Sequence, residues 1–170
     1  MQESARIARG DCKDIKELSA KDFDALLIPG GFGAAKNLCD WAFKGKEMSV
    51  KQDVELVLKD FHSAGRIIGA SCISPIVLSK VLGPNNARMT LGMRGENFPY
   101  AGAIDDATSF GCHLELMDVA GVCVDWKNRI VTTPAYMQAN ASPFEIHEGM
   151  SNFVRKITSL VRQNQSIAGR

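Results

Sequence analysis

The stretch that decides the fold of this chain reads Arg66-Ile67-Ile68-Gly69-Ala70-Ser71-Cys72-Ile73-Ser74-Pro75. Its first half is uncharged after the arginine and holds small or β-branched residues, which is typical of a central strand in a parallel sheet. Pro75 opens the next apolar run, and a proline is tolerated in the first turn of a helix because the N–H that it lacks needs no partner there. Cys72 therefore falls on a sharp turn between a strand and a helix.

Cys72 is the first candidate for a catalytic residue. A residue on such a turn is expected at the carboxyl end of the sheet, where open α/β sheets bind their ligands, and at a helix N-terminus, which stabilises a thiolate. The small neighbours Ala70, Ser71 and Ser74 suit the strained backbone of a nucleophile elbow. The alternative is a buried structural cysteine, because free cysteines are among the most buried residues of proteins.

Strand and helix patterns alternate on both sides of this turn. Strands are expected at 23–29, 67–70, 89–91, 113–117, 121–125 and 129–133, and helices at 34–43, 50–64, 75–82, 104–110 and from 142 into the 160s. This order predicts an α/β fold with a mainly parallel sheet in one domain, residues 1–170, and a hairpin formed by the last two strands. No segment before residue 20 has a strand pattern, so the sheet is expected to lack the β-α unit with which such folds begin.

A glycine loop follows the first expected strand. Gly30-Gly31-Phe32-Gly33 permits positive φ angles and close approach of the backbone, but it lacks the spacing of a dinucleotide or P-loop motif. Its strand is expected to lie beside the Cys72 strand. We therefore predict that Gly30, Gly31 and the N–H of Ile73 form an oxyanion site next to Cys72.

Composition excludes several classes of function. The chain has 20 Lys and Arg against 19 Asp and Glu, so its charge favours neither nucleic acid nor an anionic membrane as a partner. Its five cysteines form no CxxC pair and its three histidines share no ligand spacing, which argues for a reducing compartment and against a metal site. No apolar run reaches the ~20 residues of a membrane span, and the N-terminus is polar with no signal-peptide pattern. We expect no metal and no cofactor.

Spacing identifies no base for Cys72. His113 and His147 are weak candidates, expected more readily at the surface or in a helix, and Glu96 is an equally weak candidate for an acid. We predict that Lys36, Thr133 and Tyr136 bind substrate, because Lys36 follows the glycine loop and the other two end a strand that should open on the same edge of the sheet. The alternatives are a solvated lysine and a plain strand terminus stopped by a proline.

Three segments, 27–38, 72–75 and 131–137, resemble the ElbB-like branch of the ThiJ/PfpI superfamily, which has the class I glutamine amidotransferase-like fold. Residues 3–10 and 99–102 are similar to the animal mitochondrial members of that branch. The resemblance covers essentially the whole chain. It implies a flavodoxin-like three-layer sandwich, a homodimer and a mitochondrial location, or a cytoplasmic one for a bacterial-type member.

The resemblance also implies a site and an activity. Cys72 matches the family's nucleophile, and Gly30 and Gly31 match its oxyanion glycines. The implied reaction is glyoxalase-like or deglycase-like: a small aldehyde such as glyoxal is converted to glycolate without glutathione. Here Ile73 follows the cysteine in place of a histidine, and the family's glutamate lies on the first β-α unit, for which this chain has no counterpart. We therefore expect little activity from this shortened form.

Two non-enzymatic alternatives remain open. In the first, the protein senses redox state and Cys72 oxidises to a sulfinate held by the same N–H groups. In the second, it is a pseudoenzyme with a structural or partner-binding role. A true amidotransferase is disfavoured, because its His-x-Glu pair is replaced by the adjacent residues His147 and Glu148.

Overall fold

The computed structural model describes residues 5–6 and 8–168. Residues 1–4, for which the sequence predicts a polar start, lie outside the described residues. The main sheet has the order β1-β2-β6-β5, with β1 Ala25–Ile28, β2 Ile67–Ser71, β6 Ile130–Thr133 and β5 Cys123–Asp125. β1, β2 and β6 are parallel and β5 is antiparallel to β6, which confirms the mainly parallel sheet and the hairpin.

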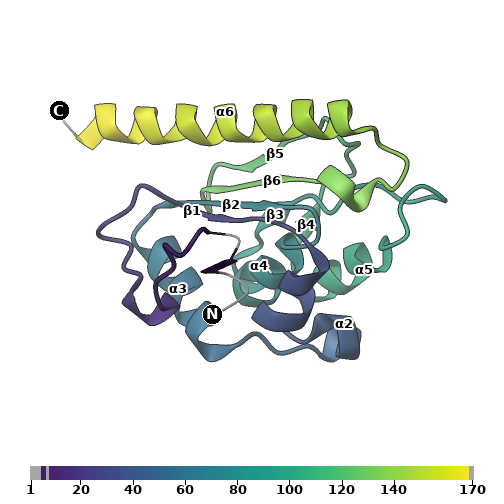
Figure 1. Cartoon of the computed structure of the whole chain (residues 1–170), viewed down its shortest axis with the longest axis horizontal. Helices are drawn as coiled ribbons and strands as arrows, with labels where there is room; N and C mark the ends of the chain where they lie inside the picture. The colour runs from purple at the N-terminus through teal and green to yellow at the C-terminus, as the bar shows by residue number, and fades with distance from the viewer. Residues whose placement is uncertain (1–4, 7, 169–170) are drawn as a thin grey trace.

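Helices cover both faces of this sheet (Figure 1). On one face lie α2 Trp41–Lys44, α3 Gln52–Ser63, α4 Pro75–Leu82 and α5 Gly102–Ser109, with a small parallel sheet of β3 Arg88–Met89 and β4 His113–Leu114. On the other face lies α6 Pro143–Ala168. Short helical turns stand at Ile15–Glu17, Ala34–Leu38, Gly45–Glu47, Gly83–Asn85 and Ala135–Met137. The three-layer, flavodoxin-like arrangement is confirmed.

Strand β2 is the centre of the molecule, and all five of its residues are buried. Gly69 lets α6 approach it, because a Cβ at this position would lie 2.6 Å from Ile157 Cδ1 and 2.9 Å from Phe153 Cζ. Val131 of β6 joins these side chains in a core between the sheet and α6. The apolar stripe of α6 therefore covers this face, and the larger core fills the opposite one.

One local prediction is wrong, and it concerns the segment around Asp40. The Asp40 carboxylate accepts hydrogen bonds from the N–H and the hydroxyl of Ser49, and α3 begins at Gln52. The helix expected at 34–43 is a π-helical turn followed by α2. It breaks at Cys39, which is extended and bridges to Val50 of a distant segment.

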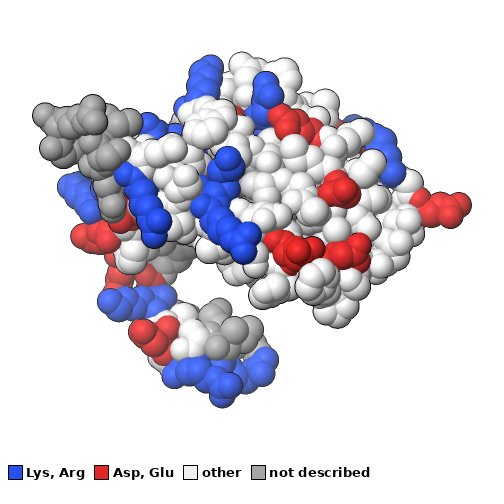
Figure 2. Space-filling model, turned by 90° about the horizontal axis from the view of Figure 1, so that it is seen from above, with Lys and Arg blue, Asp and Glu red and all other residues white. Residues whose placement is uncertain are grey.

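The outer surface of α6 is cationic. Figure 2 shows Lys and Arg side chains over its C-terminal half, where the sequence has Arg155, Lys156 and Arg162 but no acidic residue after Glu148. Arg155 and Arg162 are exposed, whereas Phe153 on the same helix is buried. Within the described ranges, no helix combines the length and the apolar character that a membrane crossing requires.

Candidate functional site

Cys72 stands between β2 and α4 in the left-handed region, with a φ of +59°. Few residues other than glycine adopt this conformation, which costs energy and is common at functional sites. The Cys72 N–H donates to the carbonyl of Thr133 on β6 at 3.0 Å. The thiol is therefore carried by a strained strand-to-helix turn, which is called the elbow below; its role as a nucleophile elbow stays a prediction.

Gly30 touches this elbow from the end of β1. A Cβ on Gly30 would lie 2.4 Å from Cys72 Cβ, 2.9 Å from the Ser71 carbonyl oxygen and 3.3 Å from Cys72 Sγ. No residue with a side chain fits there without displacing the elbow. The Gly30 N–H donates to Ser71 Oγ at 3.2 Å, so this group is not available to an oxyanion. Gly30 contributes close approach rather than a hydrogen-bond donor.

Two backbone N–H groups next to the thiol remain unused. Within the described part of the chain, the N–H groups of Gly31 and Ile73 have no hydrogen-bond acceptor. Gly31 has a φ of +98°, which favours glycine, and its carbonyl accepts from the N–H of Ala34. These are the two groups that the sequence predicts as oxyanion donors together with Gly30, and that role stays a prediction.

Two serine hydroxyls connect the elbow to the glycine loop. Ser74 Oγ accepts from the Ser71 N–H at 3.1 Å and lies 2.7 Å from the carbonyl oxygen of Ile28, to which it can donate. Ser71 Oγ accepts from Gly30. The sequence pattern predicts only that residues 71 and 74 are small. Their hydroxyls at the end of the strand and before the helix are the signal that could have identified them.

The three predicted substrate-binding residues have different surroundings. The prediction for Thr133 is wrong, because its side chain is fully buried and its hydroxyl donates to the Gly121 carbonyl at 2.9 Å. Lys36 is exposed, and its amino group lies 5.1 Å from the centre of the Phe32 ring. Tyr136 is also exposed. Substrate binding by Lys36 and Tyr136 stays a prediction.

Among the described residues, no acidic or basic side chain forms a hydrogen bond with the Cys72 thiol. Glu96, His113 and His147 are exposed, and none of the described residues forms a hydrogen bond with Cys72 Sγ. No three His, Cys, Asp or Glu side chains of the described residues lie close enough together to hold a metal ion. The described groups at the site are thus a thiol and N–H donors, which suit addition to a polarised carbonyl better than proton transfer.

The five free cysteines should differ sharply in reactivity. Cys39, Cys112 and Cys123 are buried, and burial raises the pKa of all three thiols, to about 12 for Cys112 and Cys123. Since the thiolate is the reactive form, we expect iodoacetamide at about pH 8 to alkylate Cys72 and Cys12 first. Peptide mass spectrometry at increasing times would measure this order. Labelling of the buried thiols at the rate of Cys72 would contradict it.

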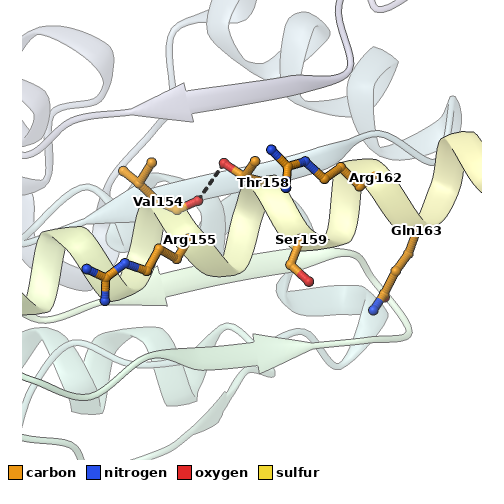
Figure 3. Close-up of a pocket in the computed structure, with 6 residues that line it drawn as sticks. All are labelled: Val154, Arg155, Thr158, Ser159, Arg162 and Gln163. Carbon is orange, nitrogen blue, oxygen red and sulfur yellow. Dashed lines mark hydrogen bonds between the residues drawn. The ribbon is translucent and has the colours of Figure 1, made fainter.

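A hollow on the outer side of α6 is separate from this site (Figure 3). The described residues that line it are Val154, Arg155, Thr158, Ser159, Arg162 and Gln163. All belong to one helix, and none is part of the elbow or the glycine loop. The hollow therefore adds no group to the chemistry at Cys72.

Known proteins are similar to this chain in sequence and in fold. The DJ-1/PfpI family model matches residues 11–103. Over 163 residues, the chain is 44% identical to the human glutamine amidotransferase-like class 1 domain-containing protein 3, mitochondrial, and 41% identical over 163 residues to the mitochondrial ES1 protein homolog of Rattus norvegicus. Each match covers 94% of this chain and 60% of the relative, so the chain spans about 60% of the length of these curated relatives.

A solved structure has a similar fold. It is the isoprenoid biosynthesis protein with an amidotransferase-like domain from Ehrlichia chaffeensis, which superposes with a TM-score of 0.77 at 30% identity. The match covers 94% of this chain and 70% of that one. The family match, the sequence relatives and this structure agree with the fold described above. The chain belongs to the DJ-1/PfpI family.

Proposed function

We propose that this protein acts on small reactive aldehydes through Cys72, with glyoxalase-like or deglycase-like chemistry. One observation carries the proposal: the thiol stands on a strained elbow, next to Ile73 and the Gly30–Gly31 loop, whose Gly31 N–H is unused like that of Ile73. Such donors stabilise negative charge on the oxygen of a carbonyl that is attacked by a nucleophile. Family membership supports the proposal.

The reaction with glyoxal would begin at one aldehyde carbon. The Cys72 thiolate forms a C–S bond, the π electrons of the carbonyl move to oxygen, and the resulting oxyanion is stabilised by the N–H groups of Gly31 and Ile73. Protonation gives a hemithioacetal. A proton then leaves this carbon and another is added to the neighbouring carbon, so the first is oxidised to a thioester and the second is reduced to an alcohol. Water cleaves the thioester, releasing glycolate and the thiol.

The second stage should be slow in this chain. Moving a proton between two carbons needs a positioned acid or base, and no described side chain forms a hydrogen bond with Cys72 Sγ. The first stage needs only the thiolate and the N–H donors. We therefore expect ready capture of aldehyde as a hemithioacetal and slow release of glycolate.

Capture and turnover can be measured separately. We expect glyoxal to protect Cys72 from iodoacetamide, and glycolate, followed by NMR, to form at least about tenfold more slowly than the adduct. Cys72→Ala should abolish glycolate formation. Cys12→Ala is the matched control, because Cys12 is also a free, incompletely buried thiol. Equal glycolate formation by Cys72→Ala would sink the proposal, and fast turnover by the wild type would refute the slow second stage.

A second candidate function uses the same groups. A sulfinate on Cys72 could accept from the N–H groups of Gly31 and Ile73, which favours a redox-sensing thiol. Selective dioxidation of Cys72 by dilute peroxide, with aldehyde capture absent, would support it over the first proposal.

The mitochondrial names of the human and rat relatives support the proposal that this chain too is mitochondrial.

A further inference from the structure

The glycine loop depends on one side chain for its hydrogen bond to the elbow. Among the described residues, the N–H of Gly30 donates to Ser71 Oγ, whereas the carbonyl of Gly31 accepts only from the N–H of Ala34, within the loop's own turn. Gly31 has no side chain that could anchor it elsewhere. The direction of the unused Gly31 N–H is therefore set through the neighbouring Gly30 peptide.

Ser71 is well placed to hold that peptide. It ends β2, where it pairs with Thr133, and it is almost fully buried. Its own N–H is held by Ser74 Oγ, and that hydroxyl is also 2.9 Å from the Ser71 carbonyl oxygen. The rigid strand thus fixes Ser71, and the Ser71 hydroxyl in turn fixes a loop that glycine leaves flexible.

We propose that Ser71 is a positioning residue of the aldehyde site: its hydroxyl holds Gly30 so that the Gly31 N–H faces the oxygen of the Cys72 adduct. The inference rests on the proposed aldehyde chemistry. Ser71 itself touches neither substrate nor the reacting atoms. Its loss should weaken stabilisation of the adduct oxygen while leaving the thiol as reactive as before.

Iodoacetamide separates these two effects. Its reaction with a thiolate develops no oxyanion, so the alkylation rate of Cys72 reports the thiol alone, whereas protection by glyoxal reports the adduct. For Ser71→Ala we expect an alkylation rate within about twofold of wild type across the pH profile, and a half-protecting glyoxal concentration about tenfold higher, since misplacing one oxyanion donor is costly. Ser71→Thr keeps the hydroxyl oxygen and should restore protection.

Ser79→Ala is the matched control, because Ser79 is a fully buried serine of α4 whose hydroxyl donates to the Ile76 carbonyl. It should lower thermal stability without changing protection. The inference is overturned if the half-protecting glyoxal concentration of Ser71→Ala equals that of the wild type. It is also overturned if the alkylation rate of Cys72 changes by the same factor as that concentration. If Ser71→Thr does not fold, the comparison of Ser71→Ala with Ser79→Ala decides. If glyoxal does not protect Cys72 in the wild type, the proposed function is contradicted, and so is the positioning role of Ser71.

Discussion

Gly30→Ala is expected to abolish aldehyde capture at Cys72 and to lower the free energy of unfolding by about 3 kcal/mol, the upper end of ordinary overpacking costs. The new Cβ would lie 2.4 Å from Cys72 Cβ and 2.9 Å from a backbone oxygen of Ser71. Moving either atom costs energy, because the Cys72 N–H is hydrogen-bonded to the Thr133 carbonyl of β6 and Ser71 ends the central strand. Urea unfolding and glyoxal protection of Cys72 would measure both effects.

Gly33→Ala provides the control within the same loop. Its Cβ would meet only Asn37 Nδ2, at 3.5 Å, and Gly33 has a right-handed φ of −59° that alanine adopts readily. We expect stability within about 1 kcal/mol of wild type, because a compatible Gly-to-Ala change mainly restricts the unfolded chain. Equal losses at the two glycines would show that the loop tolerates no side chain anywhere, and that contact with the elbow is not the cause.

Asp125→Ala should be similarly damaging, although this residue lies far from any proposed chemistry. The Asp125 carboxylate is buried at the end of β5 and accepts from the Arg88 N–H at 2.7 Å, the Asn128 N–H at 2.9 Å and Asn128 Nδ2 at 2.7 Å. Alanine leaves all three donors without their acceptor. We expect a loss of about 3 kcal/mol in the free energy of unfolding by urea, since each buried unpaired group costs about 1–3 kcal/mol.

The same carboxylate predicts a pH dependence. Burial alone would raise the pKa of Asp125, but the hydrogen bonds from Arg88, Asn128 and Lys127 together outweigh it and hold the pKa below the ordinary value of 3.8. A carboxyl group whose pKa is lower in the folded state stabilises the fold fully above its unfolded pKa. That contribution is lost as the pH falls through the folded-state pKa.

The stability advantage of wild type over Asp125→Ala should therefore shrink at acidic pH, below about 4. Urea unfolding at several pH values would follow it. Asp105→Asn is the control, because Asp105 and its partner Arg94 are both exposed, and exposed ion pairs contribute little. An advantage that stays constant into acid would show that the Asp125 charge does not contribute to it.

The fold was predictable where the pattern is local. Ile67–Ser71 and Pro75–Leu82 follow the sequence prediction closely, because uninterrupted burial and a proline in the first turn determine them without help from distant residues. The same local logic places Cys72 on the turn between them. The helix expected at 50–64 is likewise found as α3, and Gly65, with a φ of +65°, follows its C-terminal end.

The missed features depend on contacts between distant segments. The Asp40 carboxylate accepts hydrogen bonds from the N–H and the hydroxyl of Ser49, and no spacing rule indicates that pair. Thr133 was expected at the open edge, but the register of β6 turns its hydroxyl to the Gly121 carbonyl. The role of Ser71 follows only from the approach of Gly30 to the elbow, which depends on how β1 and β2 pair.

The bond from the Cys72 N–H to the Thr133 carbonyl has a consequence for biosynthesis. On the ribosome, the cysteine emerges well before β6, so the nascent chain carries a thiol whose turn has not yet been locked. Until Ile130–Thr133 pairs beside β2, this thiol is an ordinary flexible one. The turn at Cys72 can therefore be completed only after β6 has been synthesised.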